Sequence, residues 1–248
     1  MKKIAKSFVV ALAALCMFGC SKSDNNRIKM ITEATFPPYE FLRGHEVVGI
    51  DVEICRTIAQ KLGKELAVEN VNFDAVIAAV VSGKADIAAA GITVNEDRKK
   101  NVDFSIPYVK TGIVAIYKKA TGYKSPADFK GKRIGVQGGT TSETYVIEEL
   151  KQEPERMRSP AEAVAAMRAG RVDYVIADID PAKNCVKGES DLAISDFLTS
   201  EEYAVAIAKG KPELLKVINE TIAELKANGK IAEWVRSYTE ESDKLKDK

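Results

Sequence analysis

Residues 52–62, with the sequence VEICRTIAQKL, decide how the first half of the chain folds. Ile54, Ile58 and Leu62 recur every four residues, so they share one face of an amphipathic helix. Asp51 directly precedes this segment, in a place where an aspartate side chain can cap a helix. We therefore expect a helix that begins after Asp51 and buries its isoleucine face.

Working outward, apolar β-rich segments at 28–32, 66–71 and 86–89 alternate with this helix and a second one at 74–82. That order is typical of a parallel sheet with crossover helices. A second such unit follows, with strands expected at 112–117, 133–136, 172–177 and 203–208 and helices at 142–150, 160–169, 181–186, 212–228 and 231–238. The sequence predicts an α/β protein with two lobes and a charged tail at 239–248 that is frayed or solvated.

The composition excludes several classes of protein. The chain has 248 residues, and 37 Lys plus Arg balance 36 Asp plus Glu to a net charge of +1, which argues against nucleic-acid binding. His45, the only histidine, lies in a polar turn, and Cys55 and Cys185 are far apart in sequence. No spacing predicts a metal site, a cofactor or a disulfide, so we expect incidental thiols.

The N-terminus has the pattern of an export signal. Three lysines at positions 2, 3 and 6 precede the apolar run 8–18 (FVVALAALCMF), which ends in Gly19-Cys20. This ending resembles a bacterial lipobox, so we expect residues 1–19 to be a lipoprotein signal peptide and Cys20 to carry the lipid. A plain secretory signal remains the alternative. Residues 20–27 are polar and suit a tether between a membrane and a globular domain.

Polar and aromatic residues gather where the predicted strands end, which is where open α/β sheets bind ligands. Arg98 can grip a carboxylate through two hydrogen bonds, and Asp178 can accept from an ammonium group. Donors at Thr93 and Thr141, an acceptor at the Gly91 carbonyl and aromatic walls complete an α-amino acid site. The candidate ligand-binding residues are Glu33, Phe36, Phe73, Ala90, Gly91, Thr93, Arg98, Gln137, Thr140, Thr141 and Asp178.

Each of these residues also has an ordinary structural interpretation. Arg98 lies in the charged run 96–100, which could simply be solvated, and Asp178 could cap the helix that follows it. Phe73 could belong to the core, and Gly138-Gly139 could serve any tight turn.

Four motifs together resemble bacterial solute-binding proteins of family 3, the polar amino acid receptors of ABC importers. They are 49–59 (GIDVEICRTIA), 36–41 (FPPYEF), 90–93 (AGIT) with Arg98, and 103–108 (DFSIPY). The resemblance implies a two-lobed periplasmic-binding-protein type II fold with hinge strands near 108–112 and 200–204. Lobe 1 would comprise 28–107 plus 205–248, and lobe 2 would comprise 108–204.

The resemblance also implies how the protein acts. Arg98, Thr93 and Thr141 should bind the ligand's α-carboxylate, Asp178 and Gly91 its α-ammonium, and Phe36 and Phe73 its side chain. The lobes should close around the ligand, and the membrane permease should recognise the closed form. The implied protein is a monomeric receptor in the periplasm or on the cell surface, anchored only through its N-terminal lipid, and not an enzyme.

The ligand's side chain is the least determined part. Gln137 stands where some relatives carry a lysine, and Ala177 stands where glutamine receptors carry a histidine. A buried Glu33 beside a neutral Gln137 favours a cationic side chain, so arginine or lysine is preferred. A neutral polar amino acid or cystine stays open, with Glu33 then structural. A cyclohexadienyl dehydratase on the same fold, using Glu33 or Glu143 as acid, is the enzymatic alternative.

Overall fold

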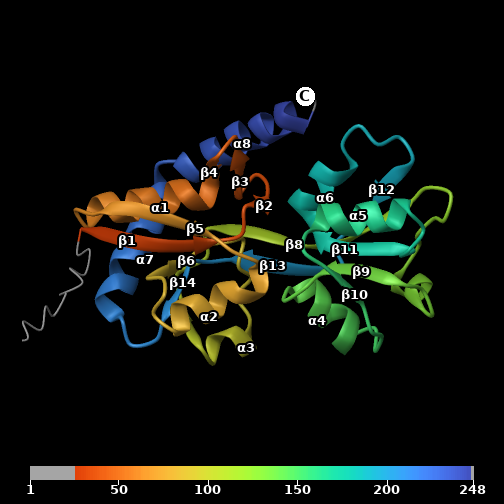
Figure 1. Ribbon diagram of the computed structural model, residues 1–248, viewed down its shortest axis with the longest axis horizontal. Coiled ribbons are helices and arrows are strands. Elements are labelled where there is room, and N and C mark those ends of the chain that lie inside the picture. The colour runs from red at the N-terminus through yellow and green to blue at the C-terminus, as the bar shows by residue number, and fades with distance from the viewer. Residues whose placement is uncertain (1–25, 247–248) are drawn as a thin grey trace, which may run out of the picture.

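The computed structural model describes residues 26–246, which form two lobes, each built around its own sheet (Figure 1). The predicted signal peptide, Cys20 and most of the predicted tether lie outside the described residues. The two-lobed α/β architecture expected from the sequence is confirmed.

The first lobe contains a sheet with strand order β5-β1-β6-β14-β7. Its three N-terminal strands are parallel, whereas β14 runs antiparallel to both β6 and β7. This matches the crossover pattern predicted around helix α1. The strands are β1 (Arg27–Thr32), β5 (Glu65–Asn70), β6 (Ile87–Ala88), β7 (Val102–Phe104) and β14 (Ala206–Ala208).

The second lobe contains a sheet with strand order β10-β9-β11-β8-β12, and β13 pairs with β8. Strands β9, β10 and β11 are parallel, but β8 is antiparallel to its neighbours because it enters from the first lobe. The strands are β8 (Val109–Lys118), β9 (Ile134–Gln137), β10 (Glu155–Met157), β11 (Tyr174–Asp178), β12 (Leu192–Ile194) and β13 (Thr199–Tyr203).

Helices cover the sheets, and the first lobe also contains a small three-stranded antiparallel sheet. The helices are α1 (Ile50–Lys61), α2 (Val76–Val81), α3 (Glu96–Lys99), α4 (Thr141–Glu148), α5 (Pro160–Arg168), α6 (Ile179–Val186), α7 (Pro212–Ala227) and α8 (Lys230–Lys246). The small sheet consists of β2 (Thr35–Phe36), β3 (Glu40–Arg43) and β4 (Glu46–Val48), and 3-10 turns lie at Phe73–Ala75 and Pro126–Phe129.

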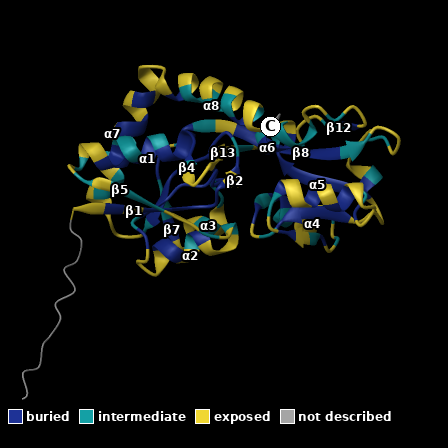
Figure 2. Ribbon diagram, turned by 45° about the horizontal axis from the view of Figure 1, so that its top comes forward, coloured by how far each residue is buried: buried dark blue, intermediate teal, exposed yellow. Residues whose placement is uncertain are grey.

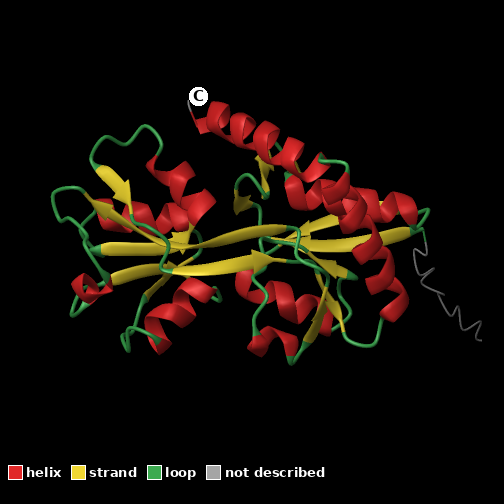
Figure 3. Ribbon diagram, turned by 180° about the vertical axis from the view of Figure 1, so that it is seen from behind, coloured by secondary structure: helices red, strands yellow, loops and turns green. Residues whose placement is uncertain are grey.

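Strands β8 and β13 pass between the lobes as an antiparallel pair (Figure 3). Their register joins Val109 to Tyr203 at one end and Ile113 to Thr199 at the other. The chain then bends at Ala204 and continues as β14 in the first sheet, so the single strand expected at 203–208 is two strands in two sheets.

Buried strands fill the interior of both lobes, and the helices carry exposed residues on their outer faces (Figure 2). The isoleucine face of α1 packs as predicted, since Ile54 and Ile58 are fully buried in the core of the first lobe. Gly49 precedes this helix with a φ of 134°, and a Cβ there would lie 2.1 Å from the Tyr39 carbonyl oxygen. Glycine is therefore required where the hairpin meets α1.

Two local predictions were wrong. Asp51 does not cap α1, because Gly49 occupies the cap position without a side-chain bond and Asp51 is instead fully buried. The tail, expected to be frayed or solvated, is not frayed: it continues helix α8 to Lys246. Its end lies near α6 (Figure 2), where Asp243 forms an ion pair with Lys187. Both features depend on contacts with residues that lie far away in the sequence.

Two simpler expectations can also be compared with the structure. His45 is exposed in the turn before β4, and Cys55 is a buried free thiol with no bridge to Cys185. Within residues 26–246, none of the helices combines the length and the apolar character needed to cross a bilayer.

Candidate ligand-binding site

Glu33 lies just after β1 and faces the second lobe. Its side chain is 6% exposed and accepts hydrogen bonds from Thr35 Oγ1 at 2.8 Å and from Gln137 Nε2 at 3.3 Å. Burial raises the pKa of Glu33, although these two donors partly oppose the shift. Among the described residues no cation pairs with this carboxylate, so the site offers a buried acid to a ligand.

Arg98 is held firmly rather than solvated with the neighbouring charges. It lies on α3, where Asn95 caps the helix by accepting from the Arg98 amide. Its Nη1 donates to the Thr93 carbonyl oxygen at 2.8 Å, and its guanidinium carbon lies 5.4 Å from the centre of the Phe73 ring. Burial lowers the pKa of Arg98, and the acids Asp178 and Glu201 oppose this shift.

Thr93 of the first lobe and Thr141 of the second lobe lie close together, and Glu201 on β13 lies between them. Thr93 Oγ1 donates to Glu201 Oε2 at 2.6 Å, and Thr141 Oγ1 donates to the same oxygen at 3.0 Å. A hydroxyl group has only one proton to donate. The Thr93 hydroxyl proton is therefore directed to Glu201 in this structure, and its predicted donation to the ligand stays a prediction.

Asp178 ends β11 and is 6% exposed. It occupies the position before α6, yet its side chain makes no capping bond. The Tyr203 hydroxyl donates to its Oδ1 at 2.5 Å. Burial and the nearby Glu201 raise the pKa of Asp178 to about 7, against the opposing influence of Tyr203 and Arg98. This is a buried acid that a ligand ammonium can hold in its ionised form.

The aromatic residues line the same region. Phe36 packs against Tyr39 and Tyr203, with ring centroids 6.0 and 6.2 Å away. Gly91, with a φ of 54°, lies beneath this ring, since an added Cβ would come within 2.7 Å of Phe36 Cε1. Phe73 is half-buried and packs on the core, and its ring also lies under Arg98; its role as a wall for the ligand side chain stays a prediction.

Two of the predicted ligand-binding residues, Ala90 and Thr140, have structural roles. The Ala90 side chain belongs to the core of the first lobe. Thr140 is buried at the start of α4, where its hydroxyl donates to the Gln137 carbonyl oxygen at 2.7 Å and accepts from the Glu143 amide. Glu143, the alternative catalytic acid, accepts from the Gly139 amide and pairs with Arg156.

Sequence reasoning missed three contributors: Glu201, Tyr39 and Tyr203. Tyr39 donates to Asp180 Oδ2 across the lobes at 2.8 Å, and Tyr203 bonds Asp178 as described. The only sequence signal for Glu201 is an acid in a short β-rich segment near the predicted hinge. Within residues 26–246, His, Cys, Asp and Glu side chains form no group of three or more suited to a metal ion.

The charges are arranged for a zwitterion. A cationic group, Arg98, lies over the Phe73 ring, and a buried acid, Asp178, lies near enough for the two charges to interact. A second buried acid, Glu33, faces Gln137. An α-amino acid with a cationic side chain supplies the three complementary charges.

Comparison with known proteins decides the family. The family model described as "Bacterial extracellular solute-binding proteins, family 3" matches residues 28–241. The chain belongs to this family. The Escherichia coli K12 relative named "ABC transporter arginine-binding protein 1" is 31% identical over 92% of this chain and 95% of its own length.

Two further relatives of family 3 are informative. The Escherichia coli K12 L-cystine-binding protein TcyJ is 32% identical over 79% of this chain and 76% of its own length. A solved structure of an amino acid ABC transporter substrate-binding protein from Streptococcus pneumoniae, bound to L-arginine, superposes with a TM-score of 0.81. It is 32% identical and covers 88% of this chain and 96% of that one.

Proposed function

We propose that this protein is the substrate-binding receptor of an amino acid ABC importer and that it captures L-arginine, with L-lysine as a weaker ligand. The observation that carries the proposal is Glu33, a buried carboxylate at the cleft without a cationic partner among the described residues. The arginine-binding relatives support the same ligand. A guanidinium group can form two parallel hydrogen bonds with a carboxylate, whereas an ammonium group binds as a point charge.

The remaining site residues bind the ligand's backbone. Arg98 and the amides of Thr93 and Thr141 hold the α-carboxylate, and Asp178 with the Gly91 carbonyl holds the α-ammonium. Phe36 and Phe73 enclose the aliphatic part of the side chain. The position of Thr141 at the start of α4 supports its role, because amides at a helix N-terminus favour an anion.

Ligand capture then proceeds by closure of the lobes about the crossing strands. We place lobe 1 at 28–107 plus 205–248 and lobe 2 at 108–204, which the pairing of β8 with β13 supports. Because the proposed ligand contacts both lobes, it stabilises the closed form by its greater affinity for that form. The closed monomer is what the permease recognises.

The N-terminal pattern places this receptor outside the cytoplasm. We propose cleavage after residue 19 and acylation of Cys20, which anchors the protein to a membrane through its lipid alone. In cells fed radiolabelled palmitate, the full-length protein should incorporate label and a Cys20→Ser variant should not. An unlabelled wild-type protein would leave a plain secretory signal.

A thermal melt against each amino acid tests the receptor function. The mature domain is unfolded and refolded to remove ligand, then melted with each of the twenty amino acids. A ligand at one hundred times its Kd stabilises the protein by about 2.7 kcal/mol. We expect the largest shift with L-arginine, a smaller one with L-lysine, and none with L-glutamate.

Glu33→Gln tests the preference for an amino acid with a basic side chain separately from amino acid binding in general. The variant keeps the shape and removes the charge, so arginine affinity should fall about tenfold or more while a neutral amino acid binds at least as well. Glu69→Gln, at an exposed position on β5, is the matched control. Shifts with neutral ligands or cystine alone would make Glu33 structural and refute the arginine proposal but not the receptor.

A further inference from the structure

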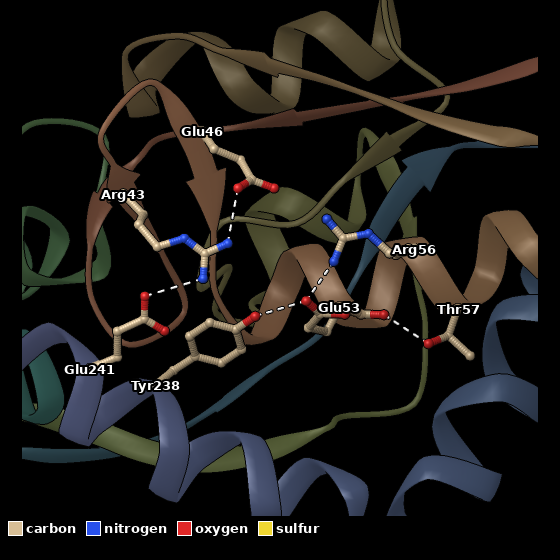
Figure 4. A network of polar contacts seen from close by, with 7 residues as sticks. All are labelled: Arg43, Glu46, Glu53, Arg56, Thr57, Tyr238 and Glu241. Carbon is tan, nitrogen blue, oxygen red and sulfur yellow. Dashed lines mark hydrogen bonds and ion pairs between the residues drawn. The ribbon is translucent and has the colours of Figure 1, made fainter.

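The two acids that follow Gly49, Asp51 and Glu53, leave helix α1 in opposite directions. Residues two apart on a helix differ by about 200° in direction. Glu53 accepts hydrogen bonds from Arg56 and from the Tyr238 hydroxyl at 2.7 Å, within the polar network that joins α1 to α8 (Figure 4). Asp51 points inward and is fully buried. The two acids therefore serve different parts of the lobe.

Asp51 connects the ligand loop to the hinge. Its Oδ2 accepts from the Gly91 amide at 2.9 Å and from the Tyr108 hydroxyl at 2.9 Å. Gly91 belongs to the loop after β6 that carries Thr93, and Tyr108 directly precedes the crossing strand β8. A single carboxylate thus fixes the ligand loop to the residue that directly precedes the crossing strand.

Glu40, at the start of β3, is the partner of Asp51. Both side chains are fully buried, and the Asp51 amide donates to the carbonyl oxygen of Tyr39, the residue before Glu40, so the two carboxyl groups lie close enough to influence each other's pKa. Neither Glu40 oxygen nor Asp51 Oδ1 has a hydrogen-bond donor in the described part of the chain, so these buried oxygens can satisfy only one another. A hydrogen bond between two carboxyl groups requires one proton, because ionised carboxylates only accept. The contact also excludes a doubly ionised pair, in which two buried like charges would meet.

The hydrogen bonds show which residue holds the proton. Asp51 accepts two donors and lies in the first turn of α1, where the helix dipole favours an anion. Glu40 has neither advantage. Burial, followed by the charge of Asp51 and those of Glu33 and Asp178, raises the pKa of Glu40 well above its usual range. The other titratable groups facing the pair are the Cys55 thiol and the hydroxyl groups of Tyr39 and Tyr108, all with raised pKa values.

We propose that Glu40 and Asp51 form a positioning pair that shares one proton: neutral Glu40 donates to ionised Asp51, which holds Gly91 and Tyr108 in the arrangement that captures the ligand. The role in capture rests on the proposed function of the site. The protonation of the pair is a separate property of the fold and can be tested without ligand.

Arginine binding tests the positioning role. Asp51→Asn removes the negative charge that accepts hydrogen bonds from the Gly91 amide and the Tyr108 hydroxyl. The Kd for L-arginine at pH 7 should therefore rise at least tenfold. Glu40→Gln keeps a neutral donor toward Asp51 and should preserve affinity within threefold of wild type. Glu53→Gln, the same substitution type in the same helix but directed toward α8, is the control and should bind like wild type. An Asp51→Asn protein with wild-type affinity would overturn the positioning role.

The pH dependence of unfolding tests the shared proton in the ligand-free protein. A carboxyl group that stays protonated in the native state and ionises on unfolding raises the unfolding equilibrium constant tenfold per pH unit. Burial raises the pKa of Asp51 to about 6, so the slope is compared above that value. Between pH 6.5 and 7.5 the wild-type constant should rise tenfold more per unit than that of Glu40→Gln. Glu53→Gln should retain the wild-type slope. Equal slopes for wild type and Glu40→Gln would overturn the shared proton, even if no variant binds arginine.

Discussion

Arg98 donates through Nη2 to the carbonyl oxygen of Gly139, 3.0 Å away, and so joins α3 of the first lobe to the turn before α4 in the second. Its Nη1 is bound within its own lobe, to the Thr93 carbonyl oxygen. The guanidinium has five N–H donors, so others stay available for a carboxylate. One side chain can therefore contact both lobes and the ligand together.

Arg98→Ala should nearly abolish ligand binding. The substitution leaves the proposed α-carboxylate without its cation, which costs about 2–5 kcal/mol and weakens arginine binding roughly thirtyfold or more. Isothermal titration calorimetry measures the effect. Lys99→Ala is the matched control, since Lys99 is exposed and pairs only with Glu96 among the described residues. Unchanged arginine affinity in Arg98→Ala would refute the site.

Asp178 should make binding depend on pH near neutrality. Its pKa is about 7, and a ligand ammonium binds the ionised form, so binding below pH 7 must release a proton. The Kd for L-arginine should rise up to tenfold for each pH unit below 7 and level off above it. Calorimetry in buffers of different ionisation enthalpy counts the released proton.

The Asp178→Asn variant provides the comparison. It should bind arginine at least about thirtyfold more weakly, because the ligand ammonium loses its buried counter-charge, and its pH profile should be flat near 7. Asp173→Asn, which removes a surface partner of Arg133, should keep the wild-type profile. A wild-type profile in Asp178→Asn would assign the titration to another group.

The sequence predicts those structural features that depend on residues close to one another in the chain. The spacing of Ile54 and Ile58 sufficed for α1, and the strand ends sufficed to find the loop of Thr93 and Arg98. Asp51 looked like a cap because its buried partners, Gly91 and Tyr108, lie 40 and 57 residues away. Such pairings depend on how the lobe packs, and no local pattern carries them.

The place of Glu201 in the site and the packing of α8 also depend on contacts between residues that are far apart in the sequence. Glu201 bonds Thr93 across 108 residues of chain and Thr141 across 60, so nothing near Glu201 in sequence indicates its partners. The C-terminal segment was expected to be frayed or solvated, yet Glu241 pairs with Arg43 of the hairpin and helps hold α8 in place (Figure 4).

Gly91→Ala should disturb the wall of the site as well as the backbone. The residue has a φ of 54°, and the new Cβ would lie 2.7 Å from Phe36 Cε1. Displacing this buried ring costs about 1–3 kcal/mol of unfolding free energy and weakens arginine binding. Gly83→Ala is the control, because it has a φ of 75° and nothing within 4 Å of the added Cβ. If both variants lose the same stability in urea denaturation, the contact with Phe36 has no effect.

Glu201→Gln should shift the pH dependence of binding without removing the site. The charge of Glu201 is the largest influence after burial that raises the pKa of Asp178. Removing that charge should therefore lower the pH midpoint of arginine binding by about one unit. It should also tighten binding at pH 6, because more of Asp178 is ionised there.

Glu202→Gln is the matched control for this shift. Glu202 is the next residue on β13, is exposed, and alternates to the other face of the strand, so its midpoint should equal that of wild type. The comparison needs only Kd values between pH 5.5 and 8. A Glu201→Gln midpoint that stays near 7 would mean that burial alone sets the pKa of Asp178, and that Glu201 acts on the site only through the hydroxyl groups of Thr93 and Thr141.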